Sequence, residues 1–170
     1  QQDVYLFAGT IMDNIAYGKP GATKEEVIEA LHLAQCDDII EKMPDGIDTQ
    51  IGSKGVYFSG GEVQRINIAR VILKNSKIVI LDEATAFADP ENETKVQKAF
   101  ENLGKIMMPV IDGYQLCRMI KNVDEIYVIN NGKIKEQGTH EELIGKGGIY
   151  SKMWNDYNTS IAWKVGEEKC

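Results

Sequence analysis

The sequence predicts an α/β fold, because helical and strand patterns alternate along its 170 residues. Three observations support this prediction. Thr-x-x-Glu and Ser-x-x-Glu pairs, each followed by apolar residues at helical spacing, indicate helix starts at Thr23 and Ser59. The continuous apolar run 78–81 is typical of a strand buried on both faces of a parallel sheet. The Asn-Gly pair at 131–132 predicts a hairpin with a type I′ turn.

The other elements follow from the same signals in chain order. Residues 18–21 are predicted to form a turn, and 47–58 are Gly-rich, show little periodicity and are predicted to be a loop. The polar tail from Asn158 is expected to fray. The predicted helices and strands are helices at 23–34, 37–42, 59–73 and 89–103, a strand at 78–81, a hairpin at 125–136 and a last helix capped by Thr139 and Glu142.

Composition and charge narrow the classes of function. The chain has 19 basic and 26 acidic side chains and a formal net charge of −7, with no cluster of Lys and Arg. This balance argues against binding DNA or RNA through their phosphates. The longest apolar runs end after a few residues, far short of the roughly 20 that span a bilayer. Three widely spaced cysteines, Cys36, Cys117 and Cys170, predict free thiols in a reducing compartment.

The segment that begins at Ser59 has the residue types of an anion-binding helix start. Gly60 and Gly61 fall in the first helical turn and leave room for close approach, while free N–H groups and the positive end of the helix dipole face outward. A phosphate group fits such a surface. The alternative is structural: Ser59 caps the helix and the glycines shape a turn. Taken alone, the segment leaves both interpretations open.

An acidic pair, Asp82 and Glu83, lies at the carboxyl end of the predicted strand 78–81. One carboxylate in this position can hold Mg²⁺, usually through water, and the next can orient or deprotonate a water that attacks phosphorus. A lone acidic pair is more often part of a solvated loop. Its combination with the glycine-rich helix start, in this order and spacing, favours the phosphate chemistry instead.

This combination resembles the nucleotide-binding domain of ATP-binding cassette (ABC) transporters over most of the chain. Residues 59–65 resemble the family signature, with Phe58 where Leu is usual and Glu62 where Gln is usual. The pattern is most similar to the exporter type. The other matching motifs are a Q-loop at 2–7, an exporter-type loop at 49–55, a Walker B strand at 78–82, a D-loop at 86–89 and a C-terminal hairpin with its helix at 132–143.

The resemblance implies a fold: a partial P-loop NTPase (ABC ATPase) core with a helical subdomain. Residues 1–170 are expected to be the C-terminal part of one nucleotide-binding domain. The helical subdomain is expected over about 10–58, and part of the α/β core over 59–170. The implied activity is ATP hydrolysis coupled to transmembrane transport.

The resemblance also implies a role for each site residue, with ATP and Mg²⁺ as the bound groups. Glu83 is the expected general base, and Asp82 and Gln2 are the expected ligands of Mg²⁺ and water. In the family, the Ser-Gly-Gly turn contacts ATP across a dimer interface, where the D-loop aspartate also lies. The residues expected to contact ATP are Ser59, Gly60, Gly61, Glu62, Gln2 and Asp89.

The implied partners are a second nucleotide-binding domain, in a homo- or heterodimer, and a transmembrane domain upstream on the same polypeptide. The implied location is the cytoplasmic face of the cell membrane, the inner membrane of a bacterium. No nucleic acid partner is expected.

The chain departs from the family pattern at its beginning. It starts at Gln1 rather than Met and contains no Gly-x-x-x-x-Gly-Lys-Ser/Thr segment, which wraps the β- and γ-phosphates of ATP. We therefore expect the chain to be a portion of a longer protein. By itself, the chain is expected to bind ATP weakly or not at all and to hydrolyse none.

A second departure lies within the chain. Family members have a histidine at the end of a strand near position 115, where this chain has Gln115. Residues 105–121 instead resemble the receiver domain of response regulators, in the loop with a Met-Pro-x-x-Asp-Gly-Tyr pattern, although the phosphoacceptor position falls at Lys105. We interpret 105–121 as foreign sequence that has replaced the switch segment, through recombination, gene decay or an assembly error.

Three other functions remain open from the sequence. A non-transport ABC ATPase shares the signature and Walker B motifs, although the exporter-type Q-loop argues against it. A catalytically degenerate half of a heterodimeric transporter agrees with the missing histidine, while the intact Glu83 argues against it. A receiver domain is the weakest alternative, because only 105–121 supports it.

Overall fold

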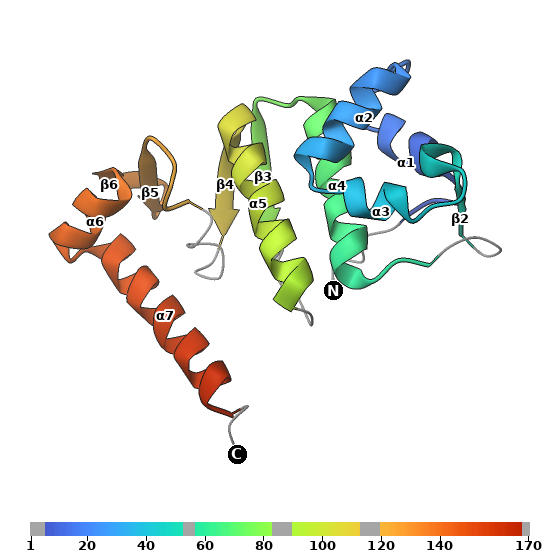
Figure 1. Ribbon diagram of the computed structural model, residues 1–170. Helices are drawn as coiled ribbons and strands as arrows, with labels where there is room; N and C mark the ends of the chain where they lie inside the picture. Colours follow the sequence, from blue (N-terminus) through green and yellow to red (C-terminus); the bar gives the residue numbers. More distant parts are fainter. Residues whose placement is uncertain (1–5, 53–56, 83–89, 113–119, 168–170) are drawn as a thin grey trace. The chain divides into compact units, whose positions relative to one another are not determined.

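The computed structural model describes residues 6–52, 57–82, 90–112 and 120–167 (Figure 1). Its contacts divide the chain into two compact units. Unit 1 comprises 1–79 and 86–109, and unit 2 comprises 80–85 and 110–170. Each unit is described by itself below.

Unit 1 is mainly helical, with short strands at its edges and part of a two-stranded sheet shared with unit 2. Its elements in chain order are β1 (Gly9–Thr10), α1 (Ile11–Ala16), α2 (Lys24–Leu33), α3 (Asp37–Glu41), η1 (Gly46–Asp48), β2 (Gln50–Ile51), α4 (Gly60–Lys74), β3 (Ile78–Asp82), α5 (Pro90–Ile106) and β4 (Met108–Asp112).

The predicted starts of α2 and α4 are confirmed. Thr23 and Ser59 are extended residues whose hydroxyls accept hydrogen bonds from the amides of Glu26 and Glu62, both at 3.3 Å. Each glutamate returns a hydrogen bond by accepting from the amide of its capping residue. These reciprocal bonds satisfy two helix-end donors at each site, which is why the pattern was readable in the sequence.

Three short elements were not predicted. α1 has a capping box formed by Thr10 and Asp13, and β1 and β2 form an antiparallel pair with Gly9 opposite Ile51. The prediction that 47–58 is a loop is wrong at 50–51, where the chain forms β2. Strands of two residues have no periodicity of their own and form here because their partners are brought together by the fold.

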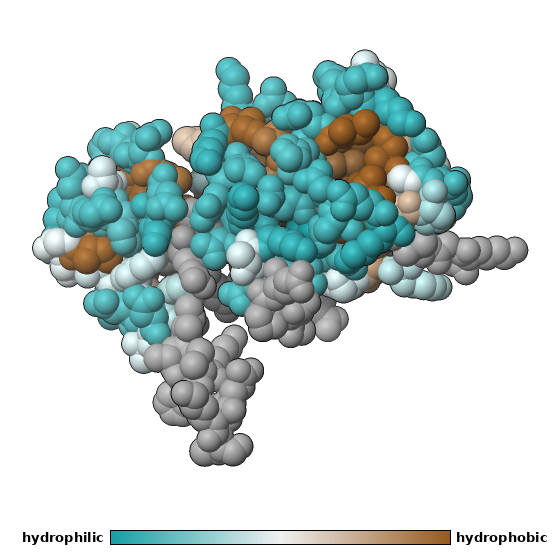
Figure 2. Space-filling model, viewed as in Figure 1, coloured by the Kyte–Doolittle hydropathy of each residue, from teal (hydrophilic) through white to brown (hydrophobic). Residues whose placement is uncertain are grey.

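The core of unit 1 is built around α4, which packs against α1, α2 and α5 (Figure 1). Its buried face is spaced at three and four residues, as in an amphipathic helix. On the face drawn in Figure 2, a hydrophobic patch beside α2 and α3 interrupts a mostly hydrophilic surface. The buried residues of α4 are Arg65, Ile66, Ile68, Ala69, Ile72 and Leu73.

The strand predicted at 78–81 is present as β3, but the prediction that both of its faces are buried is wrong. Val79 is buried, whereas the side chains of Ile78 and Ile80 are 52% and 73% exposed. β3 has β4 as its neighbour in a two-stranded sheet, and the amide of Met108 donates to the carbonyl of Lys77 at 3.0 Å. Within the described residues, only one face of β3 is covered.

Unit 2 contains the predicted hairpin and two helices. Asn131 and Gly132 have φ values of 51° and 70°, which is the left-handed geometry that a type I′ turn requires. The pairing shifts by one residue between Val128 and Ile129. The elements are β5 (Ile126–Asn130), β6 (Lys133–Gly138), α6 (His140–Lys146) and α7 (Ile149–Glu167).

The predicted last helix is present as two helices: α6 begins as expected, whereas the separate α7 was not predicted. Thr139 and Glu142 form the predicted capping box of α6. The carboxylate of Glu136 accepts from the amides of Ile149 and Tyr150, at 2.5 and 3.0 Å, and so caps α7. Because α7 continues to Glu167, the predicted fraying from Asn158 is wrong. A polar surface does not end a helix whose backbone bonds remain satisfied within it.

Replacement of Leu143 by Ala tests the core of unit 2. Leu143 is fully buried and packs in a cluster with Ile126, Val128 and Tyr150. The lost burial and the residual cavity are expected to lower the free energy of unfolding of unit 2 by about 2–5 kcal/mol. Denaturant unfolding, followed by a probe in unit 2, measures this change. Ile134→Ala is the matched control, because Ile134 is 60% exposed and its truncation should have little effect.

Candidate phosphate-binding helix start

The structure describes part of the predicted site. Ser59, Gly60, Gly61 and Glu62 lie at the start of α4, as expected. Asp82 is the last residue of β3, at the predicted strand end. Three further predicted residues, Gln2, Glu83 and Asp89, lie outside the described residues.

The capping bonds assign different tasks to Ser59 and Glu62. The carboxylate of Glu62 accepts from the amide of Ser59 at 2.8 Å, so this side chain turns back along the helix start. The Ser59 hydroxyl accepts from the amide of Glu62 at 3.3 Å. In the structure Glu62 therefore acts as a capping residue, and its direct contact with ATP stays a prediction.

The two glycines of the turn have different surroundings. Among the residues that the structure describes, a Cβ atom added to Gly60 would meet nothing within 4 Å. A Cβ atom added to Gly61 would lie 2.7 Å from the Cβ of Asn92, in the first turn of α5, which is closer than side chains tolerate. Gly60 thus leaves the helix start open, whereas Gly61 allows α5 to approach α4.

The open start of α4 can bind an anion. The first amides of a helix have no acceptor within the helix, and the helix dipole places partial positive charge there. Ser59 and Gly60 are exposed, so their backbone can be reached by a phosphate group. The structure confirms that Ser59 caps the helix, and phosphate binding at its exposed start stays a prediction.

A buried arginine below this turn was not predicted as part of the site. Arg65 is fully buried, and its guanidinium donates to both carboxylate oxygens of Asp38, at 2.6 and 3.4 Å. It also donates to the carbonyl of Gln35 and, at 3.0 Å, to the side-chain oxygen of Asn92. Lys95 donates to Asp38 at 2.8 Å.

A signal for Arg65 was present in the sequence. The position falls at helical spacing with the apolar residues 68, 69 and 72, on the face of α4 that is buried. A charged residue within an apolar stripe must find partners, because an unpaired buried charge is costly. The partner residues Asp38 and Asn92 are 27 positions away on either side, and no local pattern marks them.

The arginine changes the acidity of its main partner. Burial by itself raises the pKa of Asp38, but the hydrogen bonds and positive charges of Arg65 and Lys95 outweigh this effect and lower the pKa from 3.8 to about 2. Asp38 therefore stays ionised well into acid solution.

The end of the predicted Q-loop is fixed by a second polar cluster. The side-chain amide of Asn14 accepts from the amide of Phe7 at 2.8 Å and donates to its carbonyl at 2.9 Å. The guanidinium of Arg70, on α4, donates to the carbonyl of Asn14 at 2.7 Å and lies over the Phe7 ring at 5.4 Å. These contacts connect the residues that follow the Q-loop glutamine to α1 and α4.

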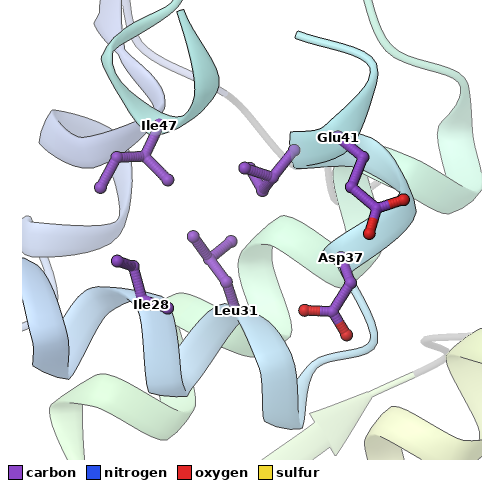
Figure 3. A pocket seen from close by; sticks show the side chains of 6 residues that line it. Ile28, Leu31, Asp37, Glu41 and Ile47 are labelled. Atoms are coloured by element: carbon purple, nitrogen blue, oxygen red, sulfur yellow. The ribbon is translucent and has the colours of Figure 1, made fainter.

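Figure 3 shows a shallow pocket between α2, α3 and η1. It has a volume of about 180 Å³ and is lined by apolar side chains, with the carboxylates of Asp37 and Glu41 on one side. It contains none of the predicted site residues. The lining residues are Ile28, Leu31, Asp37, Ile40, Glu41 and Ile47.

Metal-binding side chains do not cluster in the part of the chain that the structure describes. No group of three or more His, Cys, Asp or Glu side chains there could hold an ion. Mg²⁺ in phosphate-transfer sites needs no such cluster, because it is usually bound by one or two carboxylates, waters and the substrate phosphates. A single aspartate at the end of β3 fits that mode.

The surroundings of the two glycines predict opposite effects of Ala on stability. Gly61→Ala forces a Cβ atom against Asn92 and should lower the free energy of unfolding by about 1–3 kcal/mol. Gly60→Ala meets nothing and should leave it unchanged or raise it by up to about 1 kcal/mol, since Ala favours the helix. Urea unfolding of both variants measures the difference; equal effects would contradict the packing role of Gly61.

The pKa of Asp38 predicts how its contribution depends on pH. A carboxylate whose pKa is lowered by folding stabilises the folded state above its ordinary pKa, and this contribution is lost as the pH falls towards about 2. The stability difference between the wild type and Asp38→Asn should be full at pH 7 and shrink below about pH 4. Urea unfolding across this range tests it, with the exposed Asp45→Asn as control; a gap that persists at low pH would count against the ion pair.

Comparison with known proteins identifies the family. The ABC transporter family model matches residues 1–86, half of the chain. "Uncharacterized ABC transporter ATP-binding protein YwjA" of Bacillus subtilis (strain 168) is 46% identical over 153 residues, 90% of this chain and 26% of that protein. A Staphylococcus aureus (strain NCTC 8325) protein, "Putative multidrug export ATP-binding/permease protein", is 46% identical over 158 residues, 93% of this chain and 27% of that protein.

A solved structure agrees with these relatives. "Structure of a bacterial Atm1-family ABC exporter with ATP bound" superposes with a TM-score of 0.68 at 37% identity, covering 91% of this chain and 27% of that chain. The chain thus spans about a quarter of the length of the proteins it matches. By the match of the family model and the agreement of these relatives, the chain belongs to the ABC transporter family.

Proposed function

We propose that the chain is part of the ATP-binding domain of an exporter-type ABC transporter and supplies the signature side of an ATP site. The observation that carries this proposal is the start of α4, where Ser59 and Gly60 are exposed beside open space. Their backbone would meet the γ-phosphate of an ATP molecule held by another domain, because helix starts favour anions.

The acidic strand end would supply the hydrolytic chemistry. Glu83 is proposed as the general base that takes a proton from the attacking water, and Asp82 with Gln2 as the ligands of Mg²⁺ and water. Mg²⁺ neutralises charge that develops on the phosphates during transfer. Asp89 is proposed to lie at the interface with the second domain.

The proposed partners follow from the proposal that this chain supplies only the signature side of an ATP site. A second nucleotide-binding domain would hold ATP with its own P-loop facing Ser59. Transport would require a transmembrane domain on the same polypeptide, and the domain would lie at the cytoplasmic face of a bacterial inner membrane. Within the described ranges, no helix is long and apolar enough to cross a membrane.

A catalytically degenerate half of a heterodimeric transporter is the second candidate. It is favoured by the absence of a histidine between His32 and His140. β4, within 105–121, forms the strand beside β3 and ends at Asp112. As a degenerate half, the chain would bind ATP at the interface through Ser59 while the partner's site performs hydrolysis.

Turnover by the full-length transporter tests the first candidate. Glu83→Gln should lower the ATPase rate by a factor of about 10²–10⁴, the usual contribution of a general base, while ATP binding is retained. Glu141→Gln, the same isosteric change at an exposed carboxylate of α6, should leave the rate unchanged. Phosphate release measured with the purified protein in lipid gives both rates. An unchanged rate for Glu83→Gln would favour the degenerate half.

The isolated 170-residue chain provides a separate test. It should release phosphate from ATP no faster than buffer, because preorganised donors to the phosphates are missing and each is worth roughly 10²–10³ in rate. Turnover well above buffer, abolished by Glu83→Gln, would contradict the proposed division of the site between two domains.

A further inference from the structure

The starts of α4 and α5 are held together by two contacts on one residue. Asn92 is in the first turn of α5, and its side-chain oxygen accepts from the Arg65 guanidinium at 3.0 Å. Its Cβ lies where a Cβ on Gly61 would be only 2.7 Å away. Gly61 and Arg65 are four residues apart and therefore lie on the same face of α4. Asn92 thus lies against two successive turns on one face of α4.

Arg65 is itself fixed on its other side. Its guanidinium donates to Asp38 on α3 and to the carbonyl of Gln35, which precedes α3. Lys95, one turn beyond Asn92 on α5, donates to the same carboxylate at 2.8 Å. Because a buried guanidinium that loses its partners is strongly unfavourable, the cluster favours a single arrangement.

The location of this cluster suggests more than a stabilising role. α4 and α5 also pack against each other beyond this cluster, and both helices contain fully buried apolar residues there, among them Ala69, Ala99 and Leu103. Those contacts hold the helix pair together. Asn92 is only partly buried and therefore adds little to this apolar packing. Its bond to Arg65 mainly fixes where the starts of α4 and α5 lie.

We infer that Arg65 and Asn92 are positioning residues of the ATP site, an inference that rests on the proposed function. The start of α4 carries Ser59 and Gly60, the proposed contacts to the γ-phosphate. α5 begins at Pro90, directly after Asp89, the proposed interface residue. The Arg65–Asn92 bond holds these two parts of the site at a fixed spacing, so that both meet the partner domain and its ATP together.

The test replaces Asn92 rather than Arg65, because loss of the guanidinium would leave the half-buried Asp38 without its main partner. Asn92→Ala removes the acceptor of the Arg65 bond. Asn92→Asp keeps an oxygen acceptor in its place, replaces the amide donor by a second oxygen and adds a negative charge beside the Arg65 guanidinium. Gln97→Ala is the matched control, since Gln97 is a partly buried amide on α5 that donates to Glu101 of its own helix at 3.3 Å.

ATPase rates of the full-length transporter in lipid give the readout. Asn92→Ala should lower kcat about tenfold, the factor associated with losing a hydrogen bond to a charged group, with an unchanged KM for ATP. KM is unaffected because the P-loop contacts to ATP are made outside this chain. Asn92→Asp and Gln97→Ala should stay within about twofold of the wild-type kcat, and all three variants should be fully folded at the assay temperature.

Three results would overturn the inference. The first is a wild-type kcat in Asn92→Ala, and the second is an Asn92→Asp variant as impaired as Asn92→Ala. The third is a loss of kcat in Asn92→Ala that is fully accounted for by the fraction of protein unfolded at the assay temperature. Glu83→Gln, measured alongside, separates the two proposals. If Glu83→Gln abolishes turnover while Asn92→Ala keeps it, only the positioning role fails. If Glu83→Gln keeps turnover while Asn92→Ala lowers it, the hydrolytic role of this chain fails and the positioning role at the partner's ATP stands. If both variants keep turnover, both proposals fail.

Discussion

The buried guanidinium of Arg65 is the charge on which the arrangement of unit 1 depends. It must be paired where water cannot reach it, and its partners come from two separate stretches of the chain, one with Gln35 and Asp38 and the other with Asn92. The pairing therefore constrains how α3 and α5 lie against α4. The lowered pKa of Asp38 is the electrostatic counterpart of the same constraint. Apolar packing along α4 contributes buried surface area, while the paired guanidinium fixes how the neighbouring helices are oriented.

A consequence appears at the start of α4, where two neighbouring glycines serve different ends. Gly60 faces open space, so the first amides of the helix are accessible to an anion. Gly61 faces Asn92, so α5 can begin close to that same surface. The start of α4 and the start of α5 thereby lie side by side. One short motif combines an anion-binding function with a packing function.

The segment at 105–121, which departs from the family pattern, still contributes to the sheet. β4 forms within it and lies beside β3, so strand formation there does not require the sequence that family members have at this position. Its two β-branched residues, Val110 and Ile111, favour a strand. The chemistry of a family histidine is a separate matter, because a residue type can be lost while the backbone path is kept.

The sequence by itself determined the elements that local chemistry specifies. The capping boxes at Thr23, Ser59 and Thr139 and the Asn131-Gly132 turn are complete within a few residues, so each could be read directly. Only the tertiary structure decided the β1–β2 pairing, the exposure of Ile80, the close approach at Gly61 and the partners of Arg65. Each of these depends on residues tens of positions apart, whose proximity is set by packing and not by local pattern.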